Sequence, residues 1–109
     1  MPSQREDYLL RLILQIAETL RRLRDALTGD ASPVDIERDA DAAIGELLGP
    51  RYQLLSSLDA ASAVSLIADP RRVELWVGLI RVKAETRRRL GDEEGAAVLE
   101  KRADSLAIS

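Results

Sequence analysis

Four carboxylates in the segment 35–41 have a spacing that could bind a hard metal cation. Asp35 and Asp39 are four residues apart, and so are Glu37 and Asp41. On a helix each pair would lie on one face, and carboxylate oxygens are preferred ligands of Ca²⁺ and Mg²⁺. A dimetal helical bundle, however, adds inward-facing Glu-x-x-His units, and the chain contains no His. We therefore interpret the segment as a solvated acidic face near a helix N-terminus, and predict neither a metal site nor a cofactor.

A basic cluster follows later in the chain and comprises Arg81, Lys83, Arg87, Arg88 and Arg89. Residues 71–89 carry seven basic and two acidic side chains, whereas residues 30–46 carry six acidic and one basic. Two interpretations are open. The two segments could pair, within the molecule or across a dimer, or Arg81, Arg87 and Arg88 could bind an anionic small molecule. Nucleic acid is disfavoured as a partner, because the net charge is −3 and only 3% of the residues are aromatic.

The residue types needed for covalent catalysis are scarce. The chain has no Cys and no His, which removes the commonest nucleophile–base pairs. The serines of the segment 56–65 therefore have no His to act as base, and the two lysines, Lys83 and Lys101, lie in polar surroundings in the sequence. The six glycines are scattered and form no phosphate-binding loop. We predict a protein that is not an enzyme and has no catalytic residues.

Apolar periodicity predicts the elements that must position any binding residue. Residues recur at spacings of three and four throughout, and no alternating strand pattern of useful length appears. A chain of 109 residues fits one domain. We predict an all-α fold, a compact bundle of four long helices plus one short helix in a single domain 1–109, with helices at about 4–27, 33–48, 60–68, 70–90 and 93–107. Gly45 falls inside the second helix, where we expect a neighbouring helix to approach closely.

Two of these helices carry more apolar surface than one neighbour would cover. Leu10 and Leu14 widen the apolar face of the first helix, and Leu75, Leu79 and Val82 form a second stripe opposite that of Trp76. A central helix would bury this second stripe, whereas a peripheral one would leave an interface. We predict a protein–protein interaction surface made of Leu10, Leu14, Leu75, Leu79 and Val82, on a domain that binds another protein or self-associates. The alternative is a regulator that binds a small anion at Arg81, Arg87 and Arg88.

The segment from Leu75 to Ala107 resembles a tetratricopeptide-type helical hairpin. The small residues Ala84, Ala96 and Ala103 and the turn Leu90-Gly91-Asp92 carry the likeness. Arg87 and Glu100, however, stand where such repeats usually have large aromatic side chains. One unit cannot build a superhelix, since these arrays need about three stacked repeats. The resemblance implies a C-terminal hairpin that closes a bundle.

A wider resemblance covers almost the whole chain. The opening "QREDYLLRLILQIAETLRRL", a second helix ending in "LLG", the segment "LSSLDAASAVSLI" and the final hairpin follow one another. In this order they are similar to a family of small bacterial all-helical proteins of unknown function. The resemblance implies a fold and no activity.

The sequence also bears on location. Its apolar runs are far shorter than the roughly 20 residues that span a bilayer, and "MPSQREDY" has no apolar secretory segment. We expect a cytoplasmic protein with no membrane partner.

Overall fold

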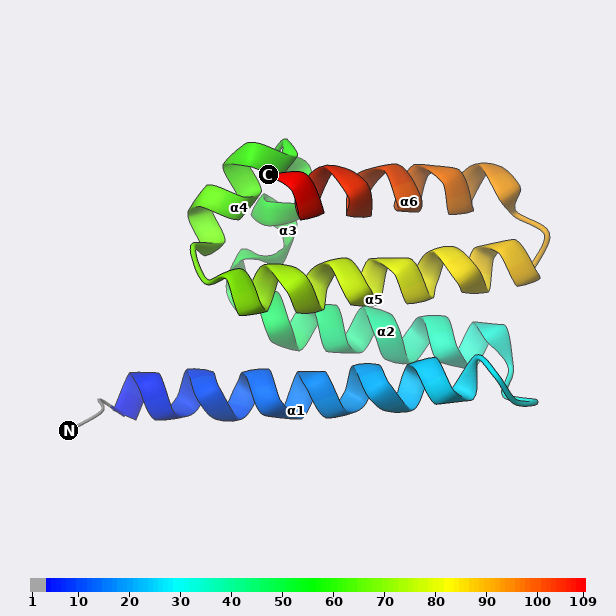
Figure 1. The fold of residues 1–109 in the computed structure, drawn as a ribbon, viewed down its shortest axis with the longest axis horizontal. Helices are drawn as coiled ribbons and strands as arrows, with labels where there is room; N and C mark the ends of the chain where they lie inside the picture. Colours follow the sequence, from blue (N-terminus) through cyan, green and yellow to red (C-terminus); the bar gives the residue numbers. More distant parts are fainter. Residues whose placement is uncertain (1–3) are drawn as a thin grey trace.

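The computed structural model describes residues 4–109, and within them regular structure is helical throughout. The elements in chain order are α1 (Gln4–Ala26), α2 (Pro33–Leu48), the 3₁₀ turn η1 (Gly49–Arg51), α3 (Tyr52–Ser57), α4 (Ala60–Ile67), α5 (Pro70–Arg89) and α6 (Glu93–Ile108). The prediction of a compact all-α bundle with four long helices is confirmed. Figure 1 shows these four lying side by side, with α3 and α4 across one end.

The helix α3 is not predicted from the sequence. Gly49 leaves the helical conformation with φ 64°, and Pro50 follows it, so α2 ends there. A 3₁₀ turn then leads into six helical residues, of which only Leu55 is buried. A segment with one buried side chain shows no periodicity, and for this reason pattern reading misses it.

An aspartate is the N-cap residue of each of the last three helices. Asp59 Oδ2 accepts a hydrogen bond from the backbone N–H of Ser62 at 3.1 Å. Asp69 Oδ1 accepts from Arg71 N at 2.9 Å, and Asp92 Oδ1 accepts from Gly95 N at 2.9 Å. Each bond satisfies one of the backbone donors that a helix N-terminus leaves unpaired. These caps determine where α4, α5 and α6 start, close to the predicted boundaries.

Helix α5 is the centre of the molecule. It packs against α6 and α4 on one side and against α1 and α2 on the other, and α1 makes no contact with α6. Both stripes of α5 are therefore covered: Trp76 and Ile80 are buried, and so are Leu79 and Val82. The prediction that Leu79 and Val82 belong to an interaction surface is wrong, because α5 is flanked on two sides and buries them in the core.

Gly45 of α2 and Gly78 of α5, both inside long helices, have different surroundings. A Cβ added to Gly45 would have no neighbour from another helix within 4 Å, so the predicted close approach at Gly45 is wrong. The close approach occurs instead at Gly78, where α5 crosses α1.

None of the helices in the described part of the chain is long and apolar enough to cross a lipid bilayer.

Candidate interaction surface

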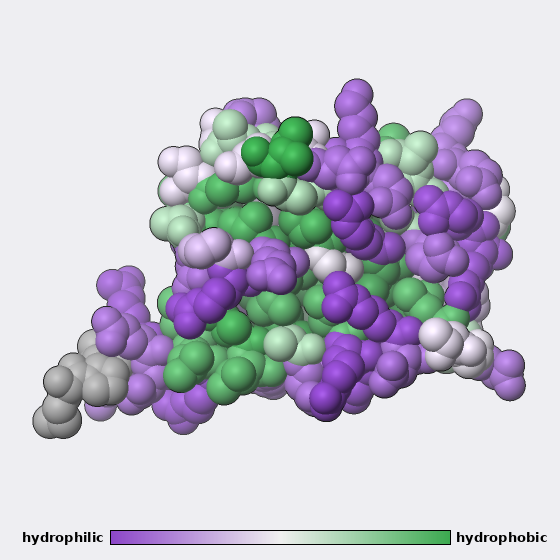
Figure 2. All heavy atoms as spheres, in the orientation of Figure 1, coloured by the Kyte–Doolittle hydropathy of each residue, from purple (hydrophilic) through white to green (hydrophobic). Residues whose placement is uncertain are grey.

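Three residues of the predicted surface stay at or near the exterior. Leu10 is 47% exposed and Leu14 61% exposed, one turn apart on α1. Leu75 is half-buried and lies with Ile13 and Ala17 in a shallow hollow of about 270 Å³ between α1 and α5. Figure 2 shows an apolar area over the N-terminal half of α1, with hydrophilic side chains around it.

The exposed flank of α1 continues this area in both directions along the helix. Its residues recur at alternating spacings of three and four, which is the repeat of a coiled-coil seam. They are Asp7, Leu10, Leu14, Ala17, Arg21 and Arg24, and all six are exposed. We call this row the α1 seam. It is a second stripe, since Ile13, Ile16 and Leu20 form the separate stripe by which α1 packs on the core.

The interaction surface predicted from the sequence contained only two residues of the α1 seam, Leu10 and Leu14. Ala17 widens the same apolar face in the sequence pattern but was not included in the predicted surface. The charged ends of the seam, Asp7, Arg21 and Arg24, carry no apolar signal and were not included either. The spacing of three and four residues continues through these polar positions, and this regularity is the sequence signal by which the full seam can be recognised.

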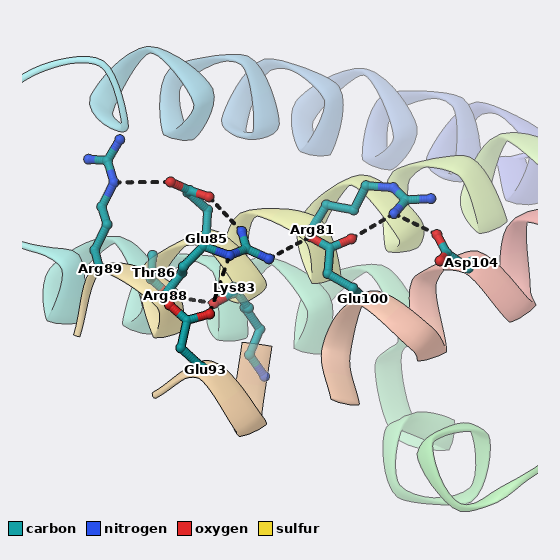
Figure 3. A network of polar contacts seen from close by, with 9 residues as sticks. All are labelled: Arg81, Lys83, Glu85, Thr86, Arg88, Arg89, Glu93, Glu100 and Asp104. Carbon is teal, nitrogen blue, oxygen red and sulfur yellow. Dashed lines mark hydrogen bonds and ion pairs between the residues drawn. The ribbon is translucent and has the colours of Figure 1, made fainter. Parts of the chain in front are cut away.

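Figure 3 shows that the side chain of Arg81, one of the predicted anion-binding arginines, points toward carboxylates of α6. Arg81 Nη1 donates to Glu100 Oε2 and to Asp104 Oδ1, both at 2.9 Å. The hydrogen bond with Asp104, with a further one to Glu100, raises the pKa of Arg81 above its ordinary value. Arg81 therefore links α5 to α6 and is already neutralised.

The other two predicted anion ligands are neutralised in the same way. Arg87 donates from Nη2 to Glu37 of α2 and lies 3.6 Å from Asp92. Arg88 lies 2.8 Å from Glu85 and 3.8 Å from Glu100. Of the two interpretations left open by the sequence, the structure has the acidic and basic segments paired within the molecule at Glu37 and Arg87.

The carboxylates considered as metal ligands have basic partners as well. Lys83 Nζ lies 2.7 Å from Asp41 Oδ1, and Arg38 lies 3.3 Å from Asp35 and 3.7 Å from Asp39. Among residues 4–109 no group of three acidic side chains could hold a metal ion. Glu37 and Asp41 are thus the acidic side of the contact between α2 and α5, whereas Asp35 and Asp39 pair within α2.

Comparison with protein-family models, curated proteins and solved structures found no match to this chain.

Proposed function

We propose that the protein is a non-catalytic protein–protein interaction domain that acts by self-association through the α1 seam. The observation that carries this proposal is the exposure of Leu10 and Leu14 at seam spacing on a helix whose core-facing stripe is already buried. Exposed leucines in a row favour burial against a second helix, at about 1.5–3 kcal/mol for each side chain that becomes fully buried. A second copy of this chain is the occupant we favour.

Charge complementarity along the seam supports this choice. The seam begins with the acidic Asp7 and ends with the basic Arg21 and Arg24. If two copies of α1 pack antiparallel about a two-fold axis, Asp7 of one copy lies opposite Arg24 of the other. Leu14 then lies opposite Ala17, which places a large side chain against a small one, and Leu10 lies opposite Arg21, whose aliphatic stem can pack against it. A two-fold interface requires such self-complementarity.

The test is the mass of the protein in solution. Sedimentation equilibrium over a range of concentrations should give a reversible dimer for the wild type. Leu14→Glu should be monomeric with the same helix content, because Leu14 is largely exposed in the single chain. Its melting temperature should match that of the wild type at concentrations low enough for the wild-type dimer to dissociate. Val98→Glu is the matched control, since Val98 is 68% exposed on α6, away from the seam; this variant should dimerise as the wild type does.

Two results would contradict the proposal. One is a wild-type protein that stays monomeric at every concentration reached. The other is a dimer that forms equally well in Leu14→Glu, since the interface would then lie elsewhere. A Leu14→Glu variant that unfolds is distinguished by its circular dichroism spectrum, and in that case Ala17→Glu, which changes the neighbouring seam position, takes its place.

The two family resemblances drawn from the sequence are part of this proposal as well. We keep the likeness of the α5–α6 hairpin to a tetratricopeptide unit as a prediction, supported by the burial of Ala84, Ala96 and Ala103. Membership of the small bacterial family, the absence of catalysis and the cytoplasmic location stay predictions too.

A further inference from the structure

A groove on the other flank of α1 contains arginines that the sequence does not associate. It has a volume of about 450 Å³ and lies between the N-terminal half of α1, the end of α2 with η1, and the start of α5. Leu9, Leu12, Leu48, Pro50 and the ring of Tyr8 make most of its lining apolar. Small-molecule sites have volumes of roughly 300–1,000 Å³ and a similar apolar lining with a few polar groups.

Three cationic side chains line this groove: Arg5, Arg51 and Arg72. They come from α1, η1 and α5. None of them forms an ion pair with any residue in the range 4–109, whereas Arg81, Arg87 and Arg88 of the basic cluster are all paired. The groove therefore brings together cations of separate segments that form no ion pair within the described residues, and the nearest carboxylate that acts on the charge of Arg72 is Asp69, which pairs with Arg71.

Arg72 is the most constrained of the three. It is half-buried, and its Nη2 donates to the carbonyl oxygen of Leu47 at 2.5 Å. Its Nε is buried and has no hydrogen-bond partner. Burial lowers the pKa of Arg72, and the positive charge of nearby Arg51 lowers it further. A guanidinium in such a position is stabilised by any anion that reaches it.

The remaining charged lining sets the charge of the ligand. Glu6 and Glu46 also line the groove, so its lining is of mixed charge and not uniformly basic. This balance favours a single negative charge over a polyanion such as a nucleotide polyphosphate. Guanidinium groups match the planar carboxylate group geometrically.

We propose that this groove binds a small organic monocarboxylate, with the carboxylate against Arg51 and Arg72 and an apolar body along Leu9, Leu12 and Pro50. The site goes beyond the proposed self-association. It lies on the flank of α1 that contacts the end of α2, and the α1 seam lies on the other flank, so a dimer would leave the groove open.

The test uses octanoate as the probe. Acetate, which has the carboxylate without the long apolar chain, and 1-octanol, which has the chain without the carboxylate, are the comparison ligands. Titration followed by amide chemical shifts should show saturable octanoate binding, with the shifts at the residues that line the groove. Acetate and 1-octanol should each bind at least about tenfold more weakly, because each lacks one of the two interactions. Arg51→Gln should weaken octanoate binding by about tenfold or more, the loss expected for one charge-assisted hydrogen bond.

Lys101→Gln is the matched control, because Lys101 is an exposed cation on α6 that does not line the groove. It should bind octanoate as the wild type does. Arg51 is itself exposed, so its substitution should leave the fold intact. The proposal is overturned if octanoate does not saturate, if 1-octanol binds equally well, or if Arg51→Gln and Lys101→Gln weaken binding to the same degree.

Discussion

Gly78 of α5 lies directly against Leu20 of α1, with no room for a side chain between them. A Cβ on Gly78 would stand 2.6 Å from Leu20 Cδ2 and 3.1 Å from Arg24 Nη2. Leu20 is itself buried, at 4% exposed. The absence of a side chain at position 78 is therefore what lets the two helices cross at this distance.

The two glycines inside helices should respond to the same substitution with opposite signs. Replacing a helical Gly by Ala gains about 0.5–1 kcal/mol in backbone entropy. At Gly45, where no atom beyond the adjacent backbone of α2 lies within 4 Å of the added Cβ, this gain should appear in full. At Gly78, overpacking costs about 1–3 kcal/mol, so Gly78→Ala should be net destabilised by roughly 1 kcal/mol. Urea unfolding of both variants measures this, and stabilisation of Gly78→Ala would show that Leu20 moves aside at little cost.

Glu37 should contribute more to stability than an exposed carboxylate. Its side chain is only 14% exposed and accepts a hydrogen bond from Arg87. The buried hydroxyl of Thr86 lies 3.2 Å from Glu37 and 2.6 Å from the carbonyl oxygen of Lys83, and its one hydrogen serves one of them at a time. Glu37→Ala removes the anionic partner of α5, and should cost about 1–3 kcal/mol in the free energy of unfolding.

Glu18→Ala is the control for Glu37→Ala. Glu18 pairs with Arg21 within α1, at 2.5 Å, but the two side chains are 53% and 70% exposed. Pairs of this kind contribute about 0–1 kcal/mol. Equal losses in the two variants would mean that the α2–α5 contact derives no stability from its buried polar groups.

Stability should fall in acid partly through the cap of α5. The hydrogen bond from the Arg71 side chain is the main cause that lowers the pKa of Asp69 below its ordinary value of 3.8. A carboxyl with a lowered folded pKa stabilises the fold above its unfolded pKa, and this contribution is lost as the pH falls through 3.8 towards the folded value. Asp69→Asn keeps a capping side chain that does not titrate. Urea unfolding at pH 7 and pH 3 should show a smaller difference for the variant, and an equal difference would refute the assignment to Asp69.

The sequence predicts the helices well because their ends have local causes. Asp59, Asp69 and Asp92 cap helices through residues two or three positions away, so the signal lies within each segment. The burial of Leu79 has a different origin. Whether a helix with two apolar stripes is central or peripheral depends on the neighbours on both sides, and periodicity describes one helix at a time.

The charged residues show the same limit. The basic cluster around Arg87 was recognisable, but its partner Glu37 lies 50 residues away. Conversely, Arg5, Arg51 and Arg72 belong to no common run, and only the tertiary fold brings them to one groove. Charge patterns along a sequence thus identify candidate cations and leave open which of them are neutralised.

The antiparallel arrangement of the α1 seam makes a specific prediction about charge reversal. In that arrangement Asp7 and Arg24 of opposite copies form two equivalent pairs per dimer. Arg24→Asp places like charges opposite each other at both sites. It should weaken dimerisation by roughly two- to thirtyfold, since rim pairs contribute about 0.2–1 kcal/mol each and the dimer has two. Adding Asp7→Arg to the same chain restores opposite charges, and should recover most of the loss.

Raising the salt concentration should shrink the difference between the single and double variants, because exposed charges are screened. Sedimentation equilibrium of the two variants measures both effects. A double variant that dimerises no better than Arg24→Asp would argue for a parallel seam, in which each of the two positions faces its own copy and like charges meet in every variant.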